Sequence, residues 1–188
     1  EIRLSLVGSE MCIRDRNMAI QLILCVETNK KADTDSKYIF ETIKYYYNID
    51  NSVKLSKIYM GTKTKYNSKE VLKEIKQKKS MFSHGNSMVI YCIDTDQFEK
   101  NPDHKKEYDA IQKYCIHENY EMIWFCHDVE EVFVGYKVSD SEKTKAASEF
   151  VKKKIVESLN DKKLSSNNLI KNTSNMLLVF DKYLQRRH

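Results

Sequence analysis

The sequence has few of the residues that interrupt regular structure, with one proline and four glycines in 188 residues. Because 41% of the residues are hydrophobic and 31% are charged, the composition excludes collagen-like and low-complexity disordered chains and is typical of one compact domain. The sequence also lacks any apolar run approaching the roughly 18 to 20 residues of a membrane-spanning helix. We therefore expect no membrane partner.

A disulfide framework is also missing, since five cysteines at irregular positions in a chain of this length do not have the required pattern. Free thiols favour a reducing compartment, so we expect a cytoplasmic protein. The absence of a glycine-rich phosphate loop argues against a P-loop nucleotidase and a dinucleotide-binding dehydrogenase. The net charge of +5 is compatible with a nucleic-acid partner but does not establish one.

The first 16 residues, EIRLSLVGSEMCIRDR, resemble translated sequencing-adaptor fragments. They have no long apolar centre followed by a cleavage site, so they do not have the pattern of a secretory signal. We expect residues 1–17 to be a non-native leader, with the natural start at Met18, and residues 18–188 to form a single domain.

Short apolar runs alternate with segments of helical periodicity. The predicted strands are residues 19–26, 53–60, 87–93 and 122–126. Helices are predicted to start near Asp35, Asn67 and His104, with a fourth along Ala147, Val151 and Ile155 and a last one across residues 174–183. This alternation predicts an α/β, Rossmann-like fold, in which a mostly parallel sheet of about four strands has helices on both faces and further helices at its C-terminal end.

Acidic residues follow two of the predicted strands. Glu27 comes directly after the first strand, and Asp94 and Asp96 follow the third. Active sites of such sheets lie at the carboxyl ends of the strands, and carboxylate oxygens are the ligands that Mg²⁺ and Mn²⁺ prefer. These acids therefore suggest a cation site. The alternative is that they only cap helices or solubilise strand ends.

These segments resemble a known family. The strand LILCVET, which ends in Glu27 and Thr28, and the strand VIYCIDTD, with Asp94 and Asp96, together resemble the Toprim domain of primases, topoisomerases and overcoming-lysogenization-defect (OLD) nucleases. The resemblance covers most of residues 19–184 and implies a Toprim fold. The chain departs from the family pattern at Thr28, where Toprim proteins usually have glycine.

A later segment is similar to the RloB-like branch of that family. The strand MIWFC is followed by HDVEEVF, which resembles the polar turn and Phe-Glu-containing helix of that branch. Glu130 and Glu131 are rival matches for one family glutamate. Glu130 is preferred because the apolar Val129 precedes it, as phenylalanine does in the family.

The resemblance implies a metal-dependent nuclease that hydrolyses phosphodiester bonds of DNA or RNA, with a role in prokaryotic antiphage defence. Asp94 and Asp96 would then hold Mg²⁺ or Mn²⁺, Glu27 would act as a general acid/base or as a shared metal ligand, and Glu130 would be auxiliary. The basic residues expected to contact nucleic-acid phosphates are Lys152, Lys153, Lys154, Arg186 and Arg187.

Other interpretations stay open. The chain also fits a noncatalytic Toprim-like subunit that binds nucleic acid or assembles into a larger complex, and a protein partner or homo-oligomer is left open. A phosphatase of the haloacid-dehalogenase type is disfavoured because its aspartate pair follows the first strand. Ligand types suited to zinc occur at Cys115, His117, Cys126 and His127, but both cysteines lie on apolar stretches, so we expect buried thiols.

Overall fold

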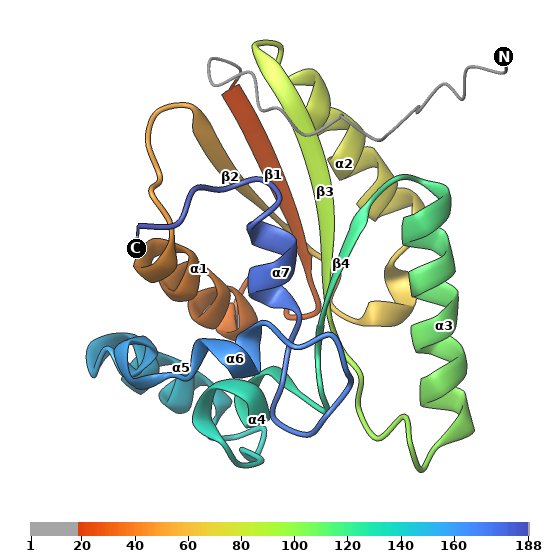
Figure 1. Cartoon of the computed structure of the whole chain (residues 1–188). Helices are drawn as coiled ribbons and strands as arrows, with labels where there is room; N and C mark the ends of the chain where they lie inside the picture. Colours follow the sequence, from red (N-terminus) through yellow and green to blue (C-terminus); the bar gives the residue numbers. More distant parts are fainter. Residues whose placement is uncertain (1–18, 188) are drawn as a thin grey trace, which may run out of the picture.

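The computed structural model describes residues 19–187, so the expected leader and Met18 lie outside the described residues. One parallel sheet has the strand order β2-β1-β3-β4 (Figure 1). Its strands are β1 (Ala19–Val26), β2 (Val53–Tyr59), β3 (Gly85–Asp94) and β4 (Glu121–Phe125). The predicted α/β, Rossmann-like architecture with a four-stranded parallel sheet is confirmed.

Helices cover both faces of the sheet (Figure 1). One face carries α2 (Lys69–Ser80) and α3 (Pro102–His117). The other carries α1 (Thr34–Tyr46), α4 (Val129–Val134), α5 (Lys143–Lys152), α6 (Asp161–Leu164) and α7 (Met176–Phe180). Short 3-10 turns occupy Lys63–Lys65 and Ile155–Ser158.

The central strand β1 contributes to two separate hydrophobic cores. Successive side chains of a strand point to opposite faces, so Leu22 and Leu24 pack under α1 and α7, whereas Ile23 and Cys25 pack under α2 and α3. All four side chains are fully buried. The continuous apolar run of β1 therefore follows from its burial on both faces.

Gly85, the first residue of β3, lies opposite Ala19 in the parallel register. A side-chain carbon at this position would overlap the carbonyl oxygen of Ala19. Glycine is required here because the two backbones approach each other closely.

The strand order reverses between β1 and β3, and we call the region outside the carboxyl ends of these two strands the crevice. The chain passes from β1 outward to β2 and then returns across β1 to form β3 on its other side. In open α/β sheets, ligands bind outside the carboxyl ends of the strands where the order reverses in this way. Glu27 follows β1 at this point, and Asp94 ends β3.

Several predicted helix boundaries were wrong. The N-cap positions belong to Asp33, Ser68 and Asn101 instead of Asp35, Asn67 and His104. The predicted fourth helix ends at Lys152, because Lys154 adopts a left-handed φ of 50°, and the last helix is limited to α7. Asp35 consequently lies inside the first turn of α1, which frees its carboxylate for contacts at the strand ends.

The described residues include no helix with both the length and the apolar character that crossing a bilayer requires. The four cysteines of the described part, Cys25, Cys92, Cys115 and Cys126, are free and buried. This agrees with the expectation of buried thiols at Cys115 and Cys126.

Candidate active site

Glu27 and Asp94 meet at the crevice between β1 and β3. Glu27 Oε1 accepts a hydrogen bond from the backbone N–H of Asp94 at 2.7 Å. This bond joins the carboxyl ends of the two strands on either side of the crevice. Two of the acids that the sequence predicts for the site are therefore neighbours.

A third carboxylate belongs to Asp35, the predicted first residue of the helix after β1. The side chain is buried, and its oxygens accept hydrogen bonds from the Thr28 N–H and the Thr34 hydroxyl, each at 3.2 Å. Asp33 lies two residues before Asp35 and has a left-handed φ of 45°. Its Oδ2 accepts a hydrogen bond from Lys57 Nζ at 2.8 Å. The entry into α1 is thereby fixed, with Asp35 directed back to the end of β1.

The loop after β4 and the start of α4 supply two more acids, Asp128 and Glu130. The Glu130 side chain is 0% exposed, and Lys143 Nζ lies 3.3 Å from its Oε2. Neither of its oxygens has a hydrogen-bond partner. A buried carboxylate without hydrogen bonds is costly unless a cation balances it.

Of the two rival glutamates, Glu130 is the one whose charge reaches Asp94. Glu131 instead contacts His127 and Lys171, at 3.2 Å and 3.7 Å. Glu130 therefore interacts electrostatically with Asp94, whereas Glu131 belongs to a group with His127 and Lys171. The choice of Glu130 as the family glutamate stays a prediction.

The pKa values of the clustered acids are raised. Burial raises the pKa of Glu27 to about 7, against the opposing effect of Lys63. Burial and then the negative charges of Glu27 and Asp35 hold the pKa of Asp94 well above its ordinary value. Burial also raises the pKa of Asp35, Asp128 and Glu130. Such a set of desolvated, mutually repelling carboxylates is suited to binding a cation.

Asp96 has a different environment from Asp94. It forms an ion pair with Lys63, a buried lysine of the 3-10 turn, and Lys63 Nζ also donates a 3.0 Å hydrogen bond to the Asp94 carbonyl oxygen. Burial opposes the charge of Lys63, but its pKa is raised by the hydrogen bond with Asp96 and by the charge of Glu27. The predicted metal ligand Asp96 is thus held by a lysine at the rim of the crevice.

Sequence reasoning missed Lys63 and Lys143. Lys63 lies in a short turn after β2, and Lys143 begins α5, a long way along the chain from the acids. Neither belongs to a motif, and the chain has many lysines. Only the folded chain distinguishes these two, because they are the lysines whose charge acts directly on Glu27 and Glu130.

The predicted phosphate-binding lysines lie at the opposite end of α5 from Lys143. Lys152 lies nine positions after Lys143 on α5, or about 14 Å along the helix axis. Lys152, Lys153 and Lys154 are exposed, and Lys153 pairs with Glu149 at 2.7 Å. These lysines therefore form a surface separate from the acids.

The two arginines predicted to bind phosphates have other contacts. Arg186 forms two hydrogen bonds with the Asp181 carboxylate, at 2.7 and 2.8 Å, and Arg187 Nε donates to the Tyr47 carbonyl oxygen at 2.9 Å. Both arginines join the C-terminal segment to the end of α1. Their positions are explained by these structural contacts.

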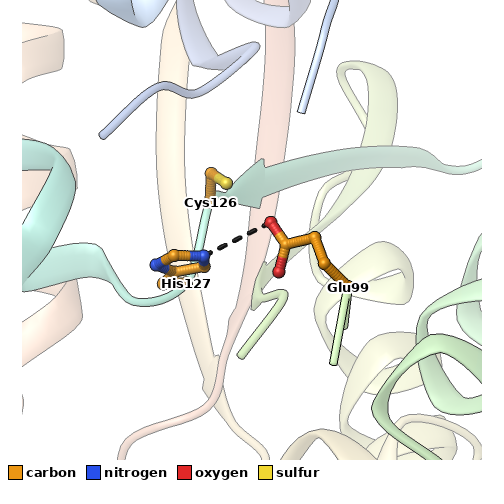
Figure 2. Close-up of side chains that lie close together, drawn as sticks. All are labelled: Glu99, Cys126 and His127. Carbon is orange, nitrogen blue, oxygen red and sulfur yellow. Dashed lines mark hydrogen bonds and ion pairs between the residues drawn. The ribbon is translucent and has the colours of Figure 1, made fainter. Parts of the chain in front are cut away.

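A second group of ligand types lies beside β4. Within residues 19–187, only Glu99, Cys126 and His127 bring three ligand atoms of His, Cys, Asp or Glu within 4.8 Å of one another (Figure 2). The zinc-compatible set in the sequence is not assembled in full, since His117 is exposed and pairs with Glu118. Glu99 was missed because nothing in its sequence context distinguishes it from other surface acids.

Comparison with protein-family models, with curated proteins and with solved structures gives no match to this chain.

Proposed function

We propose that this protein is a Mg²⁺- or Mn²⁺-dependent nuclease of the Toprim type, acting on DNA or RNA in the cytoplasm of a prokaryotic cell and serving antiphage defence. The observation that carries the proposal is the cluster of Glu27, Asp35, Asp94 and Glu130 at the point where the strand order reverses. The resemblance of the strands around Glu27 and Asp94 to Toprim sequences supports the same assignment.

The acids at the strand ends match a hard divalent cation in ligand type, because their donors are all carboxylate oxygens, which Mg²⁺ and Mn²⁺ prefer. No three of these acids bring oxygens within 4.8 Å of one another in the described residues, and Glu130 is paired with Lys143, so binding an ion requires side-chain movement. Asp94, Asp35 and Glu130 would then hold the ion. The bound ion would offset the negative charge of a phosphodiester and polarise it toward attack by water.

Glu27 is the candidate general acid/base. Its pKa of about 7 allows it to take up or release a proton at neutral pH, and its bond to the Asp94 N–H fixes its position. Lys63 and Lys143 flank the acids and would attract substrate phosphates. Asp96, the second predicted metal ligand, is paired with Lys63 and would have to leave this ion pair to bind the ion.

The test is cleavage of labelled single- and double-stranded DNA and RNA in Mg²⁺, Mn²⁺ or EDTA. We expect cleavage by the wild type in either metal, none in EDTA, and a loss of about 100-fold or more in Glu27→Gln, Asp94→Asn and Asp96→Asn. The matched control is Asp109→Asn, which removes an exposed carboxylate of α3 that pairs only with Lys105 among the described residues.

A lack of cleavage would contradict the proposed nuclease activity under the following condition. If no substrate is cleaved while the acid variants still bind nucleic acid as well as the wild type does, the nuclease proposal fails. The alternative, a noncatalytic Toprim-like binding or assembly subunit that uses its basic surface, then gains support.

A further inference from the structure

A small pocket of about 170 Å³ lies on the far side of β3 from the crevice, at the same edge of the sheet. Its walls include Asp96, His104, His127 and Asp128. Asp96 and His127 form its floor through an antiparallel bridge, in which the Asp96 N–H donates to the His127 carbonyl oxygen at 2.8 Å. The proposed nuclease chemistry uses neither histidine.

Three side chains of different chemistry converge beside this pocket. Glu99, Cys126 and His127 place a carboxylate oxygen, a sulfur and an imidazole nitrogen within 4.8 Å of one another, and Figure 2 shows the sulfur and the carboxylate on the same side of the imidazole. His127 Nε2 lies 3.3 Å from Glu99 Oε1. A tetrahedral ion with bonds of about 2.0 to 2.3 Å separates its ligand atoms by roughly 3.3 to 3.8 Å, so small side-chain movements would suffice.

The backbone holds the two adjacent ligands firmly. The Cys126 N–H donates to the Thr173 carbonyl oxygen at 2.9 Å, and the His127 N–H donates to the Thr95 hydroxyl at 2.9 Å. His127 has a left-handed φ of 69°, which a non-glycine residue rarely adopts. The strained conformation is maintained by contacts from β3 and from the segment before α7.

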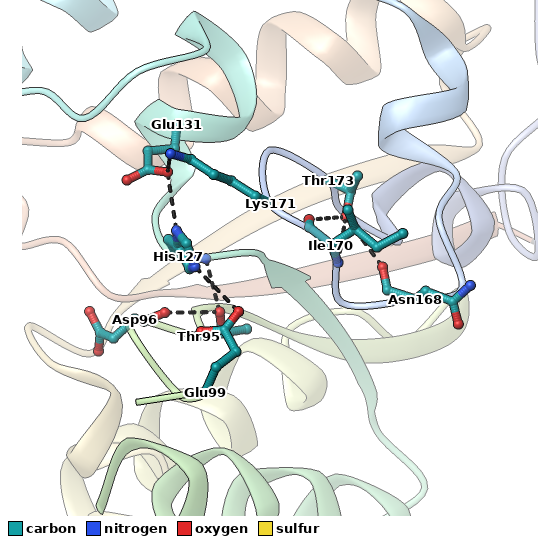
Figure 3. Close-up of polar contacts among 9 residues, drawn as sticks. All are labelled: Thr95, Asp96, Glu99, His127, Glu131, Asn168, Ile170, Lys171 and Thr173. Carbon is teal, nitrogen blue, oxygen red and sulfur yellow. Dashed lines mark hydrogen bonds and ion pairs between the residues drawn. The ribbon is translucent and has the colours of Figure 1, made fainter. Parts of the chain in front are cut away.

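The second nitrogen of His127 has a carboxylate partner. Nδ1 lies 3.2 Å from Glu131 Oε2, and Glu131 is in turn 3.7 Å from Lys171 Nζ (Figure 3). Histidines that bind metals almost always donate the N–H that faces away from the metal to a carboxylate or carbonyl, which fixes the ring and the tautomer. Glu131 is buried and supplies this arrangement, leaving Nε2 directed at Glu99.

An independent observation comes from His104 on α3. Its Nδ1 is buried without a hydrogen-bond partner, although the residue lines the same pocket as His127. A buried ring nitrogen without a hydrogen-bond partner lowers stability, so the polar groups around this pocket are not fully satisfied by the protein itself. An ion held by Glu99, Cys126 and His127 would have a water at its fourth position.

We propose that Glu99, Cys126 and His127 form a binding site for Zn²⁺, with Glu131 as the positioning residue for His127 and with the fourth coordination position open to the pocket. Thiolate and imidazole ligands select a zinc-type ion, whereas Mg²⁺ prefers oxygen ligands only. None of the three ligands is among the carboxylates of the proposed nuclease site, although Asp96 and Asp128 line the adjoining pocket. The zinc proposal does not depend on the activity proposed for those carboxylates.

The test is Zn²⁺ and Co²⁺ binding to the metal-free full chain in a large excess of Mg²⁺, which occupies oxygen-only sites. We expect a single Zn²⁺ to bind, and Co²⁺ to give a thiolate-to-metal charge-transfer absorption. Cys126→Ser should abolish that absorption, and His127→Gln should weaken Zn²⁺ binding about 100-fold. Glu131→Gln should weaken it 10- to 100-fold, as expected for a group that orients a ligand.

Matched controls separate this site from other thiols and acids. Cys115→Ser and Cys12→Ser should retain the charge-transfer absorption, and Asp94→Asn should retain Zn²⁺ affinity. Glu99→Gln alters a half-exposed side chain, so it gives a result even if Cys126→Ser fails to fold, and we expect at least a tenfold loss of affinity. The proposal is overturned if Zn²⁺ binding is absent, or if it is unchanged in Glu99→Gln and His127→Gln.

Discussion

At the scale of single residues, the buried acids at the strand ends lower the stability of the metal-free folded chain and provide oxygen ligands for a cation. Asp94 lies among carboxylates, and their charges together with burial keep its pKa raised. A group whose pKa is raised by folding destabilises the folded chain whenever the solution forces it to ionise. Functional sites often carry such a cost in stability.

Neutralising Asp94 should therefore stabilise the metal-free protein. We expect Asp94→Asn to raise the free energy of unfolding by about 1 to 2 kcal/mol at pH 8 in EDTA, equivalent to a few degrees in Tm, because it removes the cost that folding imposes on a carboxyl group whose pKa it raises. Thermal unfolding measures the change, and Asp109→Asn should leave Tm unaltered. A destabilised Asp94→Asn chain would show that Asp94 makes favourable contacts when ionised.

The raised pKa of Glu27 makes the free energy of unfolding fall as the pH rises. Burial raises the pKa of Glu27 from about 4.5 to about 7, so between these values the folded chain holds a proton that the unfolded chain has lost. The contribution of Glu27 to stability is therefore greatest below pH 4.5, falls as the pH rises to about 7, and is level above that.

Comparing Glu27→Gln with the wild type separates the contribution of Glu27 to stability from that of the other titratable groups. In EDTA, the difference in unfolding free energy between Glu27→Gln and the wild type should grow in favour of the variant from pH 5 to pH 8. The Tm increase caused by Mg²⁺ in the wild type should grow over the same range, since the ion binds ionised carboxylates. A Mg²⁺ effect that is constant across this range would contradict the assignment of these acids to the ion.

At the scale of elements, α4 and α5 are joined by a charge pair. Glu130 on α4 is fully buried, and Lys143 on the first turn of α5 is partly exposed, with 3.3 Å between their charged atoms. Removing one partner of such a pair leaves the other without compensation, and the exposure of Lys143 reduces the cost. The pair fixes the start of α5 against the loop that carries Asp128.

A double-mutant cycle tests this contact. We expect Lys143→Met to lower the free energy of unfolding by about 1 to 2 kcal/mol, because Glu130 loses its cation. Adding Glu130→Gln should recover most of that loss, since the buried charge is then gone. Chemical denaturation of the two single variants and the double variant provides the measurement, and simple additivity of the two effects would show that the residues do not interact.

At the scale of the whole molecule, two of its groups of lysines bear on the proposed function. Lys63 and Lys143 flank the acids, and Lys152, Lys153 and Lys154 are exposed at the other end of α5. A nucleic acid that reaches both places would follow the face formed by α4 and α5. Charge neutralisation on this face is measured by the salt dependence of binding.

We expect replacement of Lys152, Lys153 and Lys154 together by glutamine to weaken duplex binding and to reduce the slope of log K against log salt by about 2.7, since each of three phosphate contacts on a duplex contributes about 0.9. Cleavage at low salt should survive because the acids are intact. The matched control is replacement of Lys76, Lys78 and Lys79 on α2, which lies on the other face of the sheet. Equal effects of the two triple variants would show that only net charge matters.

The sequence by itself determined the four strands, their parallel sheet and the position of Glu27 and Asp94, because apolar runs and helical periodicity are local signals and parallel strands bring their carboxyl ends to one edge. The tertiary structure alone decided that Asp35 accepts a hydrogen bond at the end of β1, that Asp96 pairs with Lys63, and that Glu130 pairs with Lys143 whereas Glu131 pairs with Lys171. It also brought Glu99 to His127. Contacts between segments far apart in the chain depend on how loops and helices pack, and no local pattern in the sequence encodes them.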